Sequence, residues 1–190
     1  WRWVRHGISL LRDQGIRFNP GDSKLYLELG WFFQHKIGGN SDDANQYYKR
    51  AWAREMAALL DGPRPDYSAL TAPEPQSTAG ANLRRLKEEY KLDPEGMRDV
   101  DAVYGPLDWR LPQAHAIYWA LRGRKYASDF EALGADRMIY QCLAEAFFQG
   151  NLFYDPRDNV FVPAPDFDLL PRVRAAFEAA LTRFPDINSV

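Results

Sequence analysis

Residues 19–33 read Asn-Pro-Gly-Asp-Ser-Lys-Leu-Tyr-Leu-Glu-Leu-Gly-Trp-Phe-Phe, and they set the expectation for the whole fold. The first four are typical of a stop to one helix and a cap for the next. Tyr26, Leu29, Gly30 and Phe33 then follow at helical spacing, which puts one small residue among large apolar side chains. Such a face favours the close approach of a second helix.

The following segment carries complementary residue types. A helix expected over about 42–60 places Ala44, Tyr48 and Ala51 on one face. Together the two helices resemble a tetratricopeptide repeat, whose first helix has an aromatic, a Leu-Gly pair and a second aromatic, and whose second helix has alanines around an aromatic. The resemblance implies antiparallel helix pairs stacked as a solenoid, with one pair over about 20–60. The connection between the helices is about two residues longer than is usual in that family.

Two further stretches resemble the same family. One pair is expected over 137–185, where Tyr140, Leu143, Ala144 and Phe147 are followed by Val173, Phe177, Ala180 and Pro185. A shorter pair is expected over 112–133. The triplets 152–154 and 160–162 flank a turn-rich stretch and predict a short β-hairpin inside the last pair. An irregular helical domain whose close packing imitates the repeat is the alternative interpretation.

The remaining segments complete an all-α prediction for a single domain over 1–190. Prolines at 63, 65, 73 and 75 predict an irregular stretch over 62–80, within an insertion of about 62–111 that does not follow the repeat. Other predicted helices cover 3–18, 81–91, 94–104, 112–122, 125–133, 136–149 and 168–184.

Composition excludes several classes of partner. The net charge of -2 and the pI near 6.0 lack the basic footprint of a nucleic-acid binder, and no apolar run is long enough to span a membrane. The chain starts at Trp1, so we expect a piece of a longer protein with an upstream anchor or further repeats. Whether that protein is cytoplasmic or envelope-associated stays open. Lone Cys142 is expected to be a buried thiol, with a reactive one as the alternative.

No catalytic or cofactor-binding motif is present, and no cofactor or metal is expected. His115 and Asp108 form the alternative reading, an acid-base pair of an enzyme on a helical scaffold. Trp109 and Arg110 belong to residue types common at interface hot spots. Trp109 is either an interface anchor or a core plug, and Arg110 would then partner Asp108 or another carboxylate.

The leading functional prediction is a non-catalytic protein-interaction scaffold, one part of a larger bacterial-type assembly. The first helix of each pair lines the groove in the family that the chain resembles. By that resemblance, the groove residues are Lys24, Leu27, Trp31, Gln34, His35, Met138, Gln141, Glu145 and Phe148. Leu27 and Trp31 stand where carboxylate-clamping members carry polar residues, which points to an apolar anchor on the partner. A structural subunit whose groove holds its own proline-rich loop is a further alternative.

Overall fold

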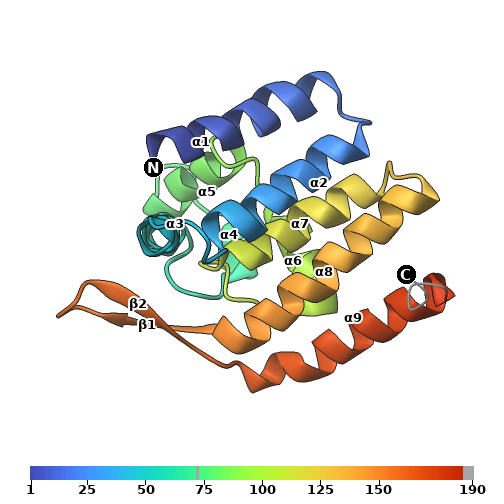
Figure 1. Cartoon of the computed structure of the whole chain (residues 1–190). Helices are drawn as coiled ribbons and strands as arrows, with labels where there is room; N and C mark the ends of the chain where they lie inside the picture. Colours follow the sequence, from blue (N-terminus) through green and yellow to red (C-terminus); the bar gives the residue numbers. More distant parts are fainter. Residues whose placement is uncertain (72, 186–190) are drawn as a thin grey trace.

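The structure, a computed structural model, describes residues 1–71 and 73–185, and this part of the chain is mostly helical (Figure 1). The helices are α1 (Arg2–Ser9), α2 (Ser23–Trp31), α3 (Asn45–Leu60), α4 (Tyr67–Thr71), α5 (Thr78–Glu88), α6 (Pro94–Tyr104), α7 (Pro112–Arg124), α8 (Asp129–Gln149) and α9 (Leu170–Arg183). Wider π-helical turns extend α1 over Leu10–Ile16 and α2 over Phe32–Ile37. Strands β1 (Asn151–Asp155) and β2 (Val160–Ala164) form one antiparallel hairpin, and a 3-10 turn over Phe167–Leu169 precedes α9.

Side-chain caps begin several helices where the sequence indicates. The Asp22 carboxylate accepts a hydrogen bond from the Lys24 backbone N–H at 3.0 Å, at the start of α2. Asp93 caps α6 in the same way. These bonds satisfy N–H groups that have no partner inside the helix, so the predicted starts of both helices are confirmed.

The two helices predicted over 125–133 and 136–149 are a single helix, α8. Ser128 and Glu131 form a reciprocal capping box at its start. Gly134 lies where the break was expected, but a glycine inside a helix costs only about 1 kcal/mol relative to alanine, and the buried side chains after it offset that cost. None of the described helices combines the length and apolarity that crossing a bilayer requires.

Helix α7 is the centre of the molecule. Every residue over 112–120 is buried, because both α2 and α8 pack along α7. The first helix, with its π-helical extension, covers α2, and α9 covers α8. Figure 1 shows α1, α2, α7, α8 and α9 side by side in this order.

Neighbouring helices in this row alternate in direction where they are in contact. The rings of Tyr26 and Trp119 have centroids 6.3 Å apart, and Gly30 faces the carbonyl oxygen of Ala116. Residue numbers therefore rise along α2 as they fall along α7, so the two helices are antiparallel.

The helices expected to pair over 137–185 also pack antiparallel. Tyr140 of α8 meets Phe177 of α9 edge to face, with ring centroids 5.4 Å apart, and Asp136 forms an ion pair with Arg183. The predicted hairpin lies between them in sequence, and its register places Phe153 opposite Val162.

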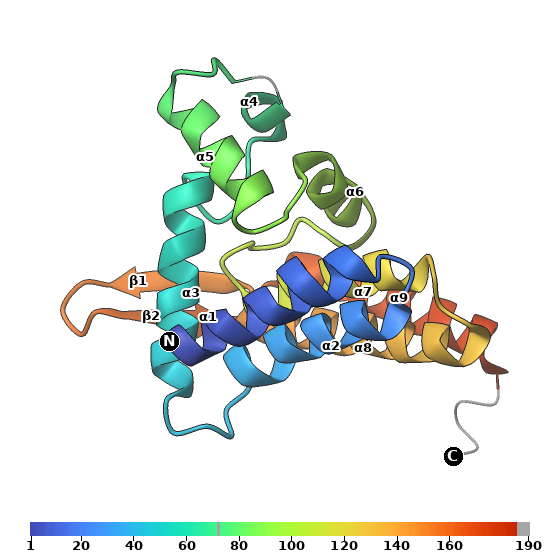
Figure 2. The same ribbon diagram turned by 90° about the horizontal axis from the view of Figure 1, so that it is seen from above.

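The pair expected over 20–60 is not formed. Helix α3 runs across the row of helices (Figure 2) and packs on α5 and on the π-helical end of α2. Gly30 does allow a close approach, but the helices that approach it are α7 and α8 and not α3. A Cβ placed on Gly30 would lie 2.6 Å from Met138 Sδ and 3.2 Å from Ala116 O. The long connection before Asn45 lets α3 turn away instead of folding back along α2.

Two of the helices within the 62–111 insertion, α5 and α6, correspond to the helices predicted over 81–91 and 94–104, whereas α4 lies in the stretch 62–80 that was expected to be irregular. The last loop of the insertion is held by Trp109, whose side chain is wholly buried and whose ring contacts those of His115 and Tyr118 on α7. The Trp109 backbone N–H donates to Pro63 O at 2.9 Å, and its indole Nε1 donates to Asp101 Oδ2 at 3.0 Å. Trp109 is therefore a core plug and not an exposed interface anchor.

Candidate partner-binding surface

Helices α2 and α8, which are more than one hundred residues apart in sequence, lie side by side and form one face of the molecule. Lys24 Nζ is 3.8 Å from Glu131 Oε1 at one end. At the other end Gln34 Nε2 donates to Glu145 Oε1 at 3.0 Å. Residue numbers rise together along both helices, so α2 and α8 are parallel, and the two segments predicted to line a groove are neighbours.

The predicted groove residues divide by exposure. Lys24, Trp31, His35, Gln141 and Phe148 are exposed, Leu27 and Glu145 are partly buried, and Gln34 and Met138 are buried. The last two are therefore structural: Met138 closes over Gly30, and Gln34 is held by Glu145.

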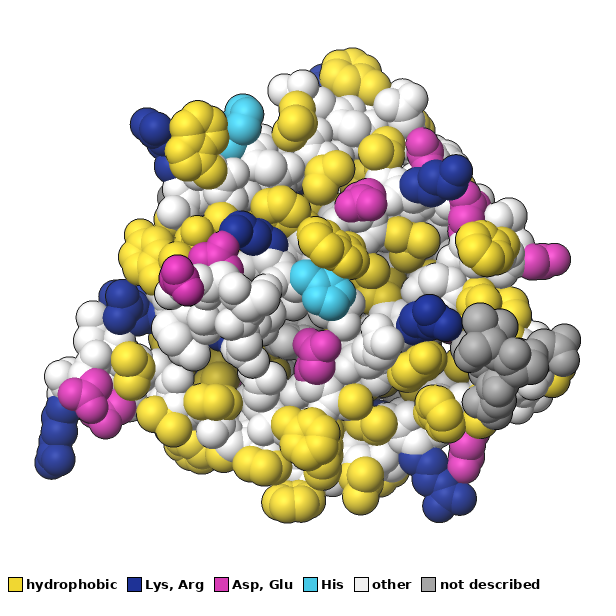
Figure 3. All heavy atoms as spheres, in the orientation of Figure 1, with side chains coloured by type: hydrophobic (Ala, Val, Ile, Leu, Met, Phe, Trp, Pro, Cys, Tyr) yellow, Lys and Arg dark blue, Asp and Glu magenta, His cyan; other side chains and the backbone are white. Residues whose placement is uncertain are grey.

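Exposed aromatic side chains are the most prominent feature of this face. Trp31 is 51% exposed and Phe148 is 64% exposed. The Trp31 ring lies against the His35 ring, with centroids 5.0 Å apart and planes tilted by 44°. Figure 3 shows hydrophobic side chains between scattered charged groups across the face that α2 and α8 share. Rigid aromatic side chains of this kind bury much surface with little loss of conformational freedom on binding.

A hydrogen-bonded carboxylate lies between the two helices. Glu145 accepts from the amides of Gln34 and Gln113, at 3.0 Å and 2.9 Å from its two oxygens. The second amide comes from buried α7, so the network joins three helices. Gln113 was not among the predicted residues, because its role depends on a contact between helices that the sequence does not specify.

The two residues of the hypothesised acid-base pair, Asp108 and His115, are bonded to other groups and not to each other. Asp108 forms an ion pair with Arg110 at 2.6 Å, whereas His115 Nε2 is 2.8 Å from the carbonyl oxygen of Trp109. His115 has no exposed surface. Burial lowers its pKa to about 4, although the hydrogen bond to the Trp109 carbonyl opposes this shift. A neutral imidazole sealed from solvent is a structural group and has no access to a substrate.

Aromatic rings surround this histidine on several sides. Its ring centroid is 5.3 Å from that of Phe33, 4.7 Å from that of Trp52 and 5.6 Å from that of Trp109. Among the described residues Nδ1 has no hydrogen-bond partner.

Arg110 links the insertion to the hairpin. Its guanidinium donates to Asp108 and to the carbonyl oxygen of Leu152 at 2.9 Å, and it lies 5.7 Å from the centre of the Phe161 ring. These contacts leave it mostly buried, as a connector between structural elements.

Burial also raises the pKa of the Cys142 thiol, and the nearby Glu145 carboxylate acts in the same direction. A thiol that is completely buried and resists ionisation is not a nucleophile, as the leading prediction for Cys142 states. Within residues 1–71 and 73–185 no group of three or more histidine, cysteine or acidic side chains is placed to hold a metal ion.

Comparison with protein-family models, with curated proteins and with solved structures finds no match.

Proposed function

We propose that this chain is a protein-binding scaffold that holds a partner segment on the face made by α2 and α8. In this proposal α2 with α7 and α8 with α9 are two helix pairs of the tetratricopeptide kind. The segment 38–111 is then an insertion between the two helices of the first pair. Antiparallel packing within each pair and parallel packing of α2 with α8 support this arrangement.

The observation that carries the proposal is Trp31. A tryptophan side chain that stays half exposed, with its ring against that of His35 and a neighbouring helix beside it, has a large apolar area left to bury. Phe148 offers a second such area on α8. Anchors of this type typically carry most of the binding energy at a protein interface. The partner segment is therefore expected to present an apolar or aromatic side chain.

The described part of the chain's own proline-rich stretch lies away from this face. Helix α4 of this stretch packs on α5 and α6, and Figure 2 shows α4 and α5 on the opposite side of the molecule from α8. This separation favours an external partner over a groove filled by the same chain.

The test starts from peptides selected on the protein from a random library. The affinity of the selected peptides is then measured for the wild type, for Trp31→Ala and for Trp3→Ala. Trp3 is 74% exposed and lies on α1, outside the proposed surface, so it is a matched control. We expect Trp31→Ala to weaken binding at least tenfold, or about 1.4 kcal/mol, and Trp3→Ala to leave it unchanged.

Phe148→Ala should weaken the same peptides, since it removes an anchor from the partner helix of the surface. Peptides that bind equally well to wild type and Trp31→Ala would contradict the proposal, as would a selection that yields no binder.

A further inference from the structure

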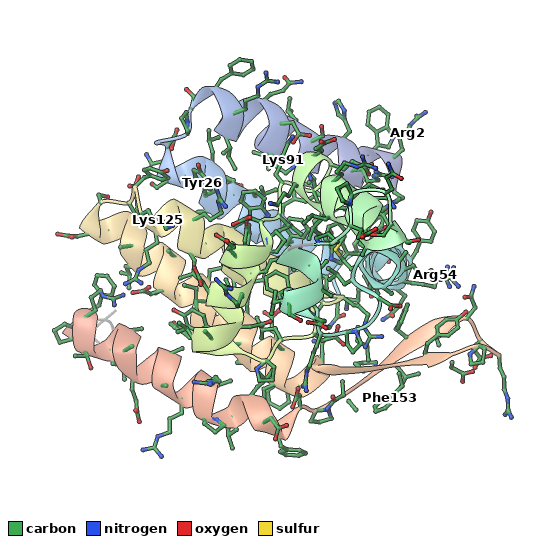
Figure 4. The ribbon with its side chains drawn as sticks, turned by 180° about the vertical axis from the view of Figure 1, so that it is seen from behind. Arg2, Tyr26, Arg54, Lys91, Lys125 and Phe153 are labelled. Carbon is green, nitrogen blue, oxygen red and sulfur yellow. The ribbon has the colours of Figure 1, made fainter. Side chains whose placement is uncertain are left out.

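A cleft lies outside the surface that the proposed scaffold function uses. It has a volume of about 390 Å³ and lies between the π-helical end of the first helix, α2, α7 and the turn after α5. Figure 4 views the molecule from behind and shows Tyr26 and Lys91, from two of these elements, on that side. The lining residues are Arg12, Asp13, Ile16, Arg17, Tyr26, Lys91, Trp119 and Arg122.

The cleft concentrates positive charge on a chain whose net charge is -2. Four of its lining residues are cations and one is an acid. The acid, Asp13, is already paired with Arg12, whose Nε lies 2.7 Å from Asp13 Oδ1. Within the part of the chain that the structure describes, no carboxylate lies within ion-pair distance of Arg17, Lys91 or Arg122. Three positive groups thus line one cleft without an ion-pair partner among the described residues.

The remaining acid of the cleft stays ionised and does not cancel these charges. Burial opposes the ionisation of Asp13, but hydrogen bonds from Arg12 and Ser9 and the nearby charges of Arg12 and Lys91 outweigh it, so the pKa is lowered. Its charge is matched by Arg12, which leaves the other cations in excess.

Lys91 is held at this site in an unfavourable backbone conformation. Its φ of 54° is left-handed, at a position just beyond the end of α5 where helices usually have glycine or asparagine. A lysine there costs roughly 1 kcal/mol relative to glycine. The strained residue places an ammonium group at the edge of the cleft.

Aromatic rings form the apolar part of the cleft. Tyr26 and Trp119 are buried beneath it, and Tyr126 stacks on Tyr26 with centroids 5.7 Å apart. The Arg122 guanidinium lies 5.9 Å from the centre of the Trp119 ring, and Tyr118 accepts a hydrogen bond from it at 2.8 Å. Both contacts orient the guanidinium and leave its charge unneutralised.

We propose that this cleft binds a small phosphorylated organic compound. The phosphate lies among Arg122, Lys91 and Arg17, and the organic part fills the rest of the cleft, above the floor that Tyr26 and Trp119 line. Two guanidinium groups and an ammonium suit a doubly charged oxyanion. The volume falls in the range of small-molecule sites, so the organic part has room beside the phosphate.

The experiment measures binding to the whole chain by isothermal titration calorimetry. The probes are adenosine 5′-monophosphate, glucose 6-phosphate, inorganic phosphate and citrate. We expect at least one of the two organic phosphates to bind more tightly than inorganic phosphate and citrate, with an affinity that falls as salt concentration rises.

Two substitutions locate the site and separate binding from folding. Arg122→Gln is expected to weaken the organic phosphate at least tenfold. Lys91→Gly should weaken it as well while it raises the melting temperature, because glycine accepts the left-handed φ. Arg2→Gln removes the same charge at the far end of the first helix (Figure 4) and should leave the affinity unchanged.

Several results would overturn the proposal. The proposal fails if neither organic phosphate binds saturably, or if inorganic phosphate or citrate binds as tightly as the organic phosphates. It also fails if Arg122→Gln and Lys91→Gly both bind the organic phosphate with the wild-type affinity. The selected peptides of the scaffold test should bind these two variants normally, so either hypothesis can fail alone.

Discussion

Replacing His115 with glutamine should remove much of the acid sensitivity of this protein. The imidazole is completely buried among aromatic rings, and Nε2 bonds the carbonyl oxygen of Trp109 at 2.8 Å. A proton added at Nδ1 would have no acceptor among the described residues. The folded protein therefore keeps this histidine neutral, whereas the unfolded chain protonates it readily.

The size of the effect follows from the two pKa values. Folding lowers the pKa of His115 from 6.5 to about 4. Between these values the unfolded state binds more protons, so the free energy of unfolding falls as the pH falls. By pH 4 the loss from this one group is roughly 3 kcal/mol, and above pH 6.5 it vanishes.

The assay is urea unfolding of the wild type and of His115→Gln at several pH values from 7 to 4. A glutamine amide can still donate to the Trp109 carbonyl, yet it does not titrate. The variant should therefore lose about 3 kcal/mol less than the wild type over this range. His6→Gln, a change at an exposed histidine of α1, should reproduce the wild-type curve. Parallel pH curves for wild type and His115→Gln would refute the reasoning.

Two further predictions concern packing and buried polar contacts. Gly30→Ala should lower the free energy of unfolding in urea by about 1–3 kcal/mol, because its Cβ would lie 2.6 Å from Met138 Sδ. Met138→Ala should destabilise the Gly30→Ala variant less than it destabilises the wild type, because it removes the side chain that the new methyl group meets. Gly134→Ala, with only Leu27 within van der Waals distance, should be neutral or stabilising, and a larger loss there would contradict this account. Asp101→Asn should cost about 1–3 kcal/mol, because an amide group would face the Trp109 indole N–H or another buried donor; unchanged unfolding would show that these hydrogen bonds contribute little.

Helix positions could be predicted because they depend on local chemistry. The Asp22 and Asp93 caps and the turn-rich stretch of the hairpin act within a few residues, so the sequence alone places them. Helix partners depend on distant residues. The small face at Gly30 indicated a close neighbour without specifying it, and α7 and α8 occupy the place assigned to α3.

The candidate sites, like the fold, could be predicted only where they depend on residues that are close in sequence. The resemblance to tetratricopeptide repeats assigned Trp31 and His35 to the groove side of α2, and both side chains are exposed. It also placed Gln34 there, but that side chain turns to Glu145, more than one hundred residues away. The cationic cleft could not be predicted from the sequence, because its charged residues come from three separate segments and no basic run marks it.

The distance in sequence between α2 and its neighbours also bears on the order in which the protein folds. Helices α7 and α8 are joined by a short turn, whereas α2 reaches α7 only after the 38–111 segment closes. Closing a loop of roughly 75 residues costs about 4 kcal/mol of chain entropy, against about 1 kcal/mol for a connection of roughly four. We therefore expect α7 and α8 to associate early and α2 to dock late. The face that α2 shares with α8 would then come into existence only in the last steps of folding.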